Sequence, residues 1–132
     1  MDALVAEVMK KAAVVWLAVA DAPAFPVWCL ASGDALHVVT GPGEQPAPGL
    51  TGAAAEARTV TVTARGDHGG AVATWAATVE RVEPGTEAWD AVAPALAAKR
   101  LNEPGPSAGL ADRWARECAL LRLVPTNQGV EL

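Results

Sequence analysis

Few side chains in this sequence are of types that do acid–base or metal chemistry, and they are widely spaced. The two histidines, His37 and His68, have no third ligand at metal-binding spacing, so we expect no metal site. Glu80 and Glu83 lie close together near the end of an expected strand, where two carboxylates could act as general acid and base. Charges at a strand end are usually only solvated, which is the simpler interpretation of this pair.

The hydroxyl and thiol side chains form no recognisable nucleophilic site. Ser32 and Ser107 lack a G-x-S-x-G elbow, and neither Cys29 nor Cys118 is flanked by residues that would lower its pKa. Both cysteines lie in strand-like apolar stretches of a chain without an export signal. We therefore expect two buried thiols rather than a disulfide, and hydrolytic chemistry has little support.

Five tryptophans are many for a chain of 132 residues that has no tyrosine. We expect most of them to be packing anchors in the core. Trp28 or Trp114 could instead flank a planar ligand.

One loop has the composition of a ligand-binding loop. Residues 40–50 read TGPGEQPAPGL and follow an expected strand, as phosphate-binding loops do. Such loops normally bring Lys or Arg, and the only charged residue here is Glu44. The chemistry of the loop therefore depends on what the rest of the fold places beside it.

The composition fits one domain spanning residues 1–132, and it narrows the possible partners. With 52% hydrophobic residues and a mean hydropathy of +0.22, the chain is rich in apolar groups, which favours a dimer that buries a face. Its net charge of −5 opposes binding to nucleic acid. The apolar run 12–20 is too short to span a bilayer, so we expect a cytoplasmic protein that does not enter the membrane.

The elements expected to position these residues are mostly short strands. Apolar residues recur at helical spacing from Asp2 to Ala12, which predicts a short helix. Runs of β-branched and aromatic residues predict three strands, over 13–20, 24–31 and 35–40. The second and third of these strands are joined by a hairpin-like Ser-Gly-Asp turn.

The second half of the chain continues the same pattern. Residues 50–57 are helix-tolerant, and strands are predicted over 58–64, 71–83 and 117–124. Thr86 is predicted to cap a helix that extends to Arg100 and that Pro94 must kink or restart. Six short strands with a few helices indicate an α+β, mainly β protein with an antiparallel sheet curled into a small barrel.

The order of these segments resembles the flavin-nucleotide-binding split-barrel family related to pyridoxamine phosphate oxidase, which includes deazaflavin-dependent members. The resemblance extends over roughly residues 1 to 125 and rests on the stretches WLAVADAP, AFPVWCLAS, GDALHVVTG, RTVTVTARG and WAATVERVEPG. It implies a six-stranded antiparallel split β-barrel with flanking helices and a homodimer. It also implies that an FMN or deazaflavin nucleotide lies in a groove between subunits, with its ring near Val27, Trp28 and Cys29.

The loop departs from the pattern of that family, T-G-x-x-x-R-K-x-R-N-L, in which basic side chains hold the cofactor phosphate. Thr40, Gly41 and Leu50 match, whereas Gln45, Pro46 and Pro48 occupy the basic positions and Gly49 the Asn position. Charge-assisted hydrogen bonds to phosphate are worth roughly 1.5–3 kcal/mol each. The donors that remain are Thr40, Gly41, Gly43 and Gln45. Compensation could come from Arg58, Arg65 or Lys99, or from Arg113 or Arg116 of a second subunit.

Two functions are compatible with this loop and with the resemblance. The first is a flavin- or deazaflavin-dependent oxidoreductase in which the cofactor does the chemistry and no side chain need be catalytic. The second is a non-catalytic split-barrel dimer that has lost the phosphate clamp and binds an uncharged or apolar ligand, or serves a structural role. A fold alone does not decide between them.

Overall fold

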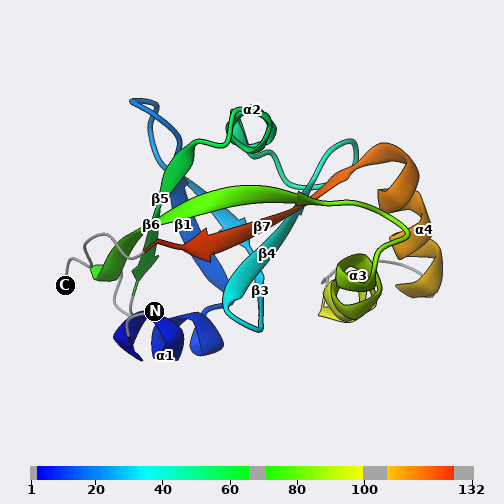
Figure 1. The fold of residues 1–132 in the computed structure, drawn as a ribbon, viewed down its shortest axis with the longest axis horizontal. Helices are drawn as coiled ribbons and strands as arrows, with labels where there is room; N and C mark the ends of the chain where they lie inside the picture. Colours follow the sequence, from blue (N-terminus) through cyan, green and yellow to red (C-terminus); the bar gives the residue numbers. More distant parts are fainter. Residues whose placement is uncertain (1–2, 66–70, 100–106, 127–132) are drawn as a thin grey trace.

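The computed structural model describes residues 3–65, 71–99 and 107–126, and its centre is one antiparallel sheet of seven strands (Figure 1). The strands are β1 (Val14–Ala18), β2 (Phe25–Trp28), β3 (Leu30–Ser32), β4 (Ala35–Thr40), β5 (Thr59–Arg65), β6 (Ala71–Val82) and β7 (Ala119–Pro125). Their order across the sheet is β2-β1-β5-β6-β7-β4-β3. The two outermost strands, β2 and β3, are joined through Cys29 alone, so the sheet curls back on itself into a nearly closed barrel.

The expected antiparallel barrel of an α+β protein is therefore confirmed, but the strand count of six is wrong. The single strand expected over 24–31 is divided at Cys29 because the chain changes partner there. Trp28 pairs with Val14 of β1, whereas Leu30 pairs with His37 of β4. Those two partners lie on opposite sides of the sheet order, so one continuous strand cannot serve both.

The helices are α1 (Ala3–Lys11), α2 (Leu50–Ala55), α3 (Glu87–Lys99) and α4 (Ser107–Glu117). The cap predicted at Thr86 is confirmed, because its hydroxyl accepts a hydrogen bond from the backbone N–H of Trp89 at 3.2 Å. Of the kink or restart predicted at Pro94, the restart is wrong, because α3 is continuous through that exposed residue. Residues 108–116, for which no helix or strand was expected, belong to α4.

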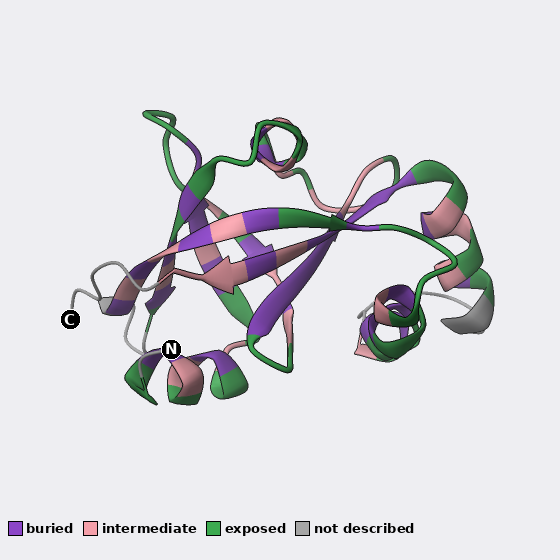
Figure 2. Ribbon diagram, viewed as in Figure 1, coloured by how far each residue is buried: buried purple, intermediate pink, exposed green. Residues whose placement is uncertain are grey.

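Two apolar clusters lie on the two faces of the sheet. Figure 2 shows that buried residues occur both in the strands and in the helices. The first fills the barrel with inward-facing strand residues such as Leu17, Val62 and Trp75, and α1 and α2 lie at opposite ends of the barrel (Figure 1). The second lies on the outer face, where α3 and α4 cover Val39, Val82 and Leu120. Strand β4 is consequently buried on both faces over Ala35–Val39.

Two further expectations concern thiols and membranes. Cys29 and Cys118 are both free and buried, which confirms the prediction of two thiols rather than a disulfide. Among the residues that the structure describes, no helix is long and apolar enough to cross a membrane.

The packing of the barrel interior predicts a large difference between two substitutions of apolar residues. Trp75 is 2% exposed and Val14 is 50% exposed. Trp75→Ala should lower the free energy of unfolding by about 3–5 kcal/mol, whereas Val14→Ala should change it by less than about 0.5 kcal/mol. Urea denaturation measures both, and similar losses for the two variants would contradict this placement of the core.

Candidate functional site

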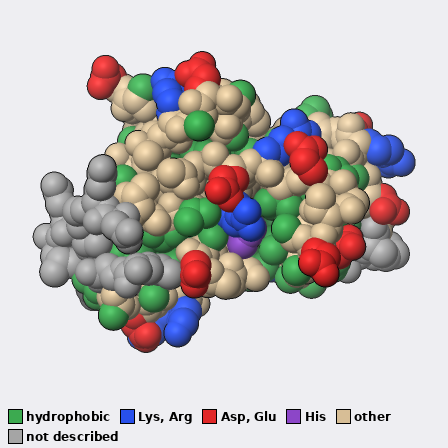
Figure 3. Space-filling view, in the orientation of Figure 1, with side chains coloured by type: hydrophobic (Ala, Val, Ile, Leu, Met, Phe, Trp, Pro, Cys, Tyr) green, Lys and Arg blue, Asp and Glu red, His purple; other side chains and the backbone are tan. Residues whose placement is uncertain are grey.

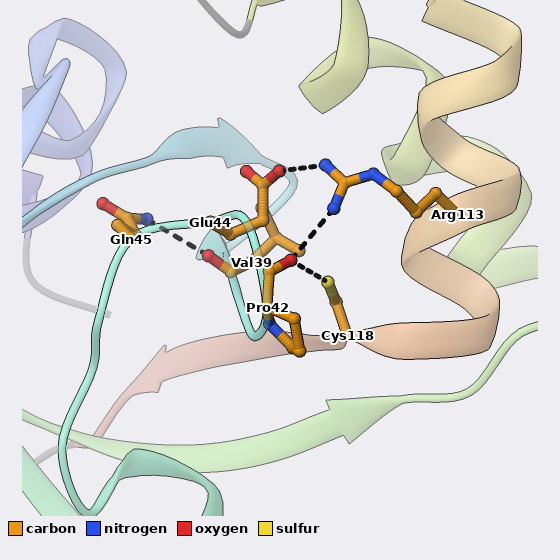
Figure 4. A network of polar contacts seen from close by, with 6 residues as sticks. All are labelled: Val39, Pro42, Glu44, Gln45, Arg113 and Cys118. Carbon is orange, nitrogen blue, oxygen red and sulfur yellow. Dashed lines mark hydrogen bonds and ion pairs between the residues drawn. The ribbon is translucent and has the colours of Figure 1, made fainter.

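The loop between β4 and α2, residues 41–49, folds against the start of β7 and against α4 (Figure 4). Gly41 has a φ of +144°, and a Cβ there would lie 2.9 Å from both Cα and Sγ of Cys118. A side chain at Gly41 would therefore collide with β7, which explains why glycine follows Thr40. The Cys118 thiol, at 3.8 Å from the Pro42 carbonyl oxygen, is a weak donor to the same loop. Burial raises the pKa of this thiol.

The only charged side chain of the loop is neutralised within the protein. The Glu44 side chain is fully buried, and its Oε2 accepts a hydrogen bond from Nη2 of Arg113 at 2.5 Å. Nη1 of the same guanidinium donates to the Pro42 carbonyl oxygen at 2.9 Å (Figure 4). A buried carboxylate is tolerated only when it is paired in this way. Arg113 therefore ties the loop to α4.

The side chain of Gln45 completes the backbone hydrogen bonding at the corner between β2 and β3. Its Oε1 accepts from the backbone N–H of Trp28 at 2.8 Å, and its Nε2 donates to the carbonyl oxygens of Trp28 at 3.1 Å and of Val39 at 3.3 Å. The Thr40 hydroxyl donates to the Gln45 carbonyl oxygen at 2.8 Å. The Gln45 side chain therefore makes the hydrogen bonds that a neighbouring strand would otherwise make to Trp28. Both hydrogens of its amide nitrogen are directed to backbone carbonyl oxygens.

Both main-chain polar groups of the next residue, Cys29, also have hydrogen-bond partners. Its N–H donates to the Ala13 carbonyl oxygen at 3.0 Å, and its carbonyl oxygen accepts from Nζ of Lys99 at the end of α3. Burial raises the pKa of the Cys29 thiol to about 11, with Lys99 acting in the opposite direction. The thiol is protonated at neutral pH and is a poor nucleophile.

The structure separates the six residues expected to bind a cofactor. Val27 and Cys29 point into the barrel, where they are 2% and 0% exposed. Trp28 faces the other way and lies half-buried against Trp114, with ring centroids 6.4 Å apart and an interplanar angle of 40°. Of the three residues expected near a ring, only Trp28 has a side chain on the outer face. The side chain of Gln45 is bonded to the backbone of Trp28 and Val39 at the corner between β2 and β3.

The remaining two residues expected to bind the cofactor, Thr40 and Gly41, line a pocket of about 390 Å³. The pocket is bounded by the loop, α2, β6 and the junction of α4 with β7. The same pocket is lined by Thr51, Arg81, Arg116 and Glu117. Two arginines therefore line a pocket beside the loop that lacks cations, and one of them, Arg81, also lies 3.5 Å from Glu83 in an exposed ion pair. Sequence reasoning missed Arg81 and Thr51, since only the pairing of β6 with β7 and the position of α2 bring them here.

Most of the cations proposed to compensate for the loop are engaged elsewhere. Arg58 lies 2.8 Å from Glu56, the Arg65 guanidinium lies 4.6 Å from the centroid of the Trp16 ring, and Lys99 and Arg113 are bound as above. Arg116 is the exception, and it lines the pocket of its own chain. Among the described residues no three His, Cys, Asp or Glu side chains gather as metal ligands, and His68 lies outside that part of the chain.

No model of a protein family matches this chain, and a search of curated proteins finds no match. Solved structures do share its fold. The heme storage protein HutZ from Vibrio cholerae has a TM-score of 0.64 at 20% identity, over 97% of this chain and 91% of that one. A FAD-binding protein from Mesorhizobium loti has a TM-score of 0.59 at 18% identity, over 98% and 92%.

A general stress FMN/FAD-binding protein from Xanthomonas citri has a TM-score of 0.56 at 18% identity, over 95% and 83% of the two chains. These likenesses confirm the split-barrel fold expected from the resemblance of the sequence. At such identities they show the fold alone.

The role of Gln45 predicts a loss of stability on truncation. Gln45→Ala leaves the buried backbone groups of Trp28 without partners, so it should lower the free energy of unfolding by about 1–3 kcal/mol. Lys10→Ala, on the exposed face of α1, is the matched control and should have little effect. Urea denaturation measures both, and equal small effects would show that Gln45 does not support the corner.

The ion pair of Glu44 with Arg113 predicts non-additive effects. Arg113→Met should cost at least about 2 kcal/mol because it leaves the Glu44 carboxylate buried without its guanidinium. The double variant Glu44→Gln with Arg113→Met should recover part of that loss, since the buried charge is gone. A double-mutant cycle from denaturation curves tests this, and purely additive effects would contradict the pairing.

Proposed function

We propose that this protein binds a flavin or deazaflavin nucleotide and holds the cofactor phosphate on Arg81 and Arg116 instead of on the loop. The observation that carries the proposal is the pocket beside residues 41–49, which Arg81, Arg116 and Thr51 line. Nε of Arg81 lies 3.5 Å from Oε1 of Glu83, an exposed pair that a phosphate can replace. Among the described residues that line it, two are arginines and only Glu117 is acidic, so this lining has a net positive charge in a chain of net charge −5. The solved structures with this fold include FAD- and FMN-binding proteins.

The donor groups of the pocket fit a phosphate. Each guanidinium can donate two parallel hydrogen bonds to phosphate oxygens, and the Thr51 hydroxyl can donate another. Thr40 is a poorer donor, because its hydroxyl hydrogen is directed to the Gln45 carbonyl oxygen. Two charge-assisted bonds worth roughly 1.5–3 kcal/mol each replace most of what the loop has lost.

The cofactor ring is assigned to the outer face of Trp28. Gln45 connects the two parts of this site, since its side chain binds the Trp28 backbone and its carbonyl oxygen accepts from Thr40. When bound, the flavin or deazaflavin supplies hydride-transfer chemistry for a small substrate. The chain's own residues then bind the phosphate, orient the ring against an indole and exclude water.

The proposal includes a homodimer in the cytoplasm. The high apolar content of the chain favours an assembly that buries a further face, and a second subunit would close the groove over the ring. Light scattering of the purified protein measures the assembly.

A second candidate is a non-catalytic split-barrel dimer that binds an uncharged or apolar ligand or has a structural role. The observation that favours it is the closed loop, in which Glu44 and Gln45 are both engaged with the protein itself. Such a loop offers no anion cradle of its own.

Fluorescence titration separates the two candidates, with tryptophan quenching as the readout. The purified chain should bind FMN or a deazaflavin nucleotide saturably. Arg81→Met and Arg116→Met should each weaken FMN binding about tenfold or more, which corresponds to one charge-assisted bond. Arg58→Met is the matched control, because Arg58, like Arg81, pairs with a nearby glutamate but does not line the pocket.

Riboflavin, which lacks the phosphate, should bind more weakly than FMN and with the same affinity to all of these variants. Unchanged FMN affinity in Arg81→Met and Arg116→Met would place the phosphate elsewhere. Failure of the unaltered chain to bind either nucleotide would remove the first candidate and leave the second.

A further inference from the structure

A second pocket, of about 470 Å³, lies on the outer face of the sheet between the β3–β4 hairpin, β6, β7 and α3. It shares no lining residue with the pocket beside the loop. Its polar groups are Ser32, Asp34, His37, Glu80 and Arg122, and Ala and Val side chains of β4, β7 and α3 form the apolar part. Figure 3 shows this side of the molecule, with histidine, basic and acidic side chains together among hydrophobic ones.

Strand pairing places three of these polar residues in one row. His37 of β4 is opposite Arg122 of β7, and Arg122 is opposite Glu80 of β6. Cross-strand partners point to the same face of a sheet, so the three side chains lie side by side. Nε and Nη2 of Arg122 both donate to Oε1 of Glu80, at 2.9 and 2.6 Å. The guanidinium charge is therefore already balanced.

His37 is the unusual member of the row, because it is polar and only 3% exposed. Nδ1 lies 3.3 Å from the Leu30 carbonyl oxygen. A carbonyl oxygen can only accept, so Nδ1 carries the proton and Nε2 of the neutral ring has a lone pair. Burial lowers the pKa of His37, which agrees with a neutral ring. Within the described residues, Nε2 has no hydrogen-bond partner, and this imidazole lines the pocket.

The pocket is therefore rich in acceptors. Its described lining has two carboxylates, one imidazole lone pair and a single cation, which is already paired with Glu80. We propose that it binds a small organic cation, which has an ammonium or amidinium group on a compact apolar body. The N–H groups of this cation donate hydrogen bonds to Nε2 of His37 and to the carboxylates of Asp34 and Glu80. The apolar body packs on the Ala and Val side chains of α3 and β7. This site does not depend on the proposed function.

A matched series of three probes tests the charge and donor requirements. Benzamidine is cationic with N–H donors, benzamide is its neutral analogue, and benzoate is anionic. Nuclear magnetic resonance of the His37 ring, in a His68→Gln background that leaves one histidine signal, follows binding at this pocket. Benzamidine should shift the signal saturably, benzamide should bind at least tenfold more weakly, and benzoate should not bind.

Two substitutions locate the contacts. Asp34→Asn, in the exposed hairpin turn, should weaken benzamidine binding about twofold to fivefold, as loss of an exposed ion pair does. His37→Leu should weaken it about tenfold through loss of the lone pair, measured by calorimetry after a thermal melt shows that the variant folds. Asp112→Asn, on α4 outside the pocket, is the control and should have no effect.

The result that supports the proposal is benzamidine binding that depends on Asp34. Preference for benzoate over benzamidine, absence of a saturable shift, or equal affinity of Asp34→Asn and the parent chain would each overturn it. Because none of these probes is a flavin, the outcome is independent of the FMN titration. If His37→Leu does not fold, the Asp34 variant and the probe series still decide.

Discussion

The barrel depends on the hydrogen bonds that the main-chain N–H and C=O groups make at the corner formed by Trp28 and Cys29. There the chain passes from pairing with β1 to pairing with β4. The N–H and carbonyl oxygen of Trp28 and the carbonyl oxygen of Cys29 are bonded to side chains instead of to another strand. A buried backbone group without a partner costs about 1–3 kcal/mol. Gln45 supplies both groups that Trp28 needs, and Lys99 supplies the donor for Cys29. The corner is thus held by side chains 17 and 70 residues away in the sequence.

This constraint explains the chemistry of the loop that follows β4. Gln45 stands where the resembling family has a basic residue, and its amide faces the barrel corner rather than a ligand. The adjacent Glu44 is also directed inward, to Arg113 of α4. The presence of Gln45 in place of a basic residue, and of Glu44 beside it, therefore has a physical reason in these inward contacts. The side chains of Glu44 and Gln45 are therefore part of the framework.

The fold was predictable wherever one face of an element is packed. In β5 and β6 the alternation of valine or alanine with polar residues indicates which side chains are buried, and Val60, Val62 and Trp75 are indeed at most 3% exposed. The division of 24–31 was not predictable, because both halves are apolar and only the order of the strands reveals the change of partner. Helix α4 had a local signal, since Leu110 and Trp114 are four residues apart and both buried.

The site was predictable only in part, for a related reason. Thr40 and Gly41 line a pocket because the loop begins there, as the family pattern suggests. The ion pair between Glu44 and Arg113 joins residues 69 apart, and oppositely charged residues at that separation carry no local signal. Arg81 reaches the same pocket only through the register of β6 against β7.

That register also separates the two pockets. Successive residues of a strand project to opposite faces, so Glu80 and Arg81 belong to different surfaces. Arg81 pairs with Leu121, whose side chain lies in the barrel, and Glu80 pairs with Arg122 on the outer face. The chain carries a net charge of −5, and this field opposes a phosphate at long range. Binding at Arg81 and Arg116 must therefore come from short-range contacts, whereas the field and the local carboxylates both favour a cation beside His37.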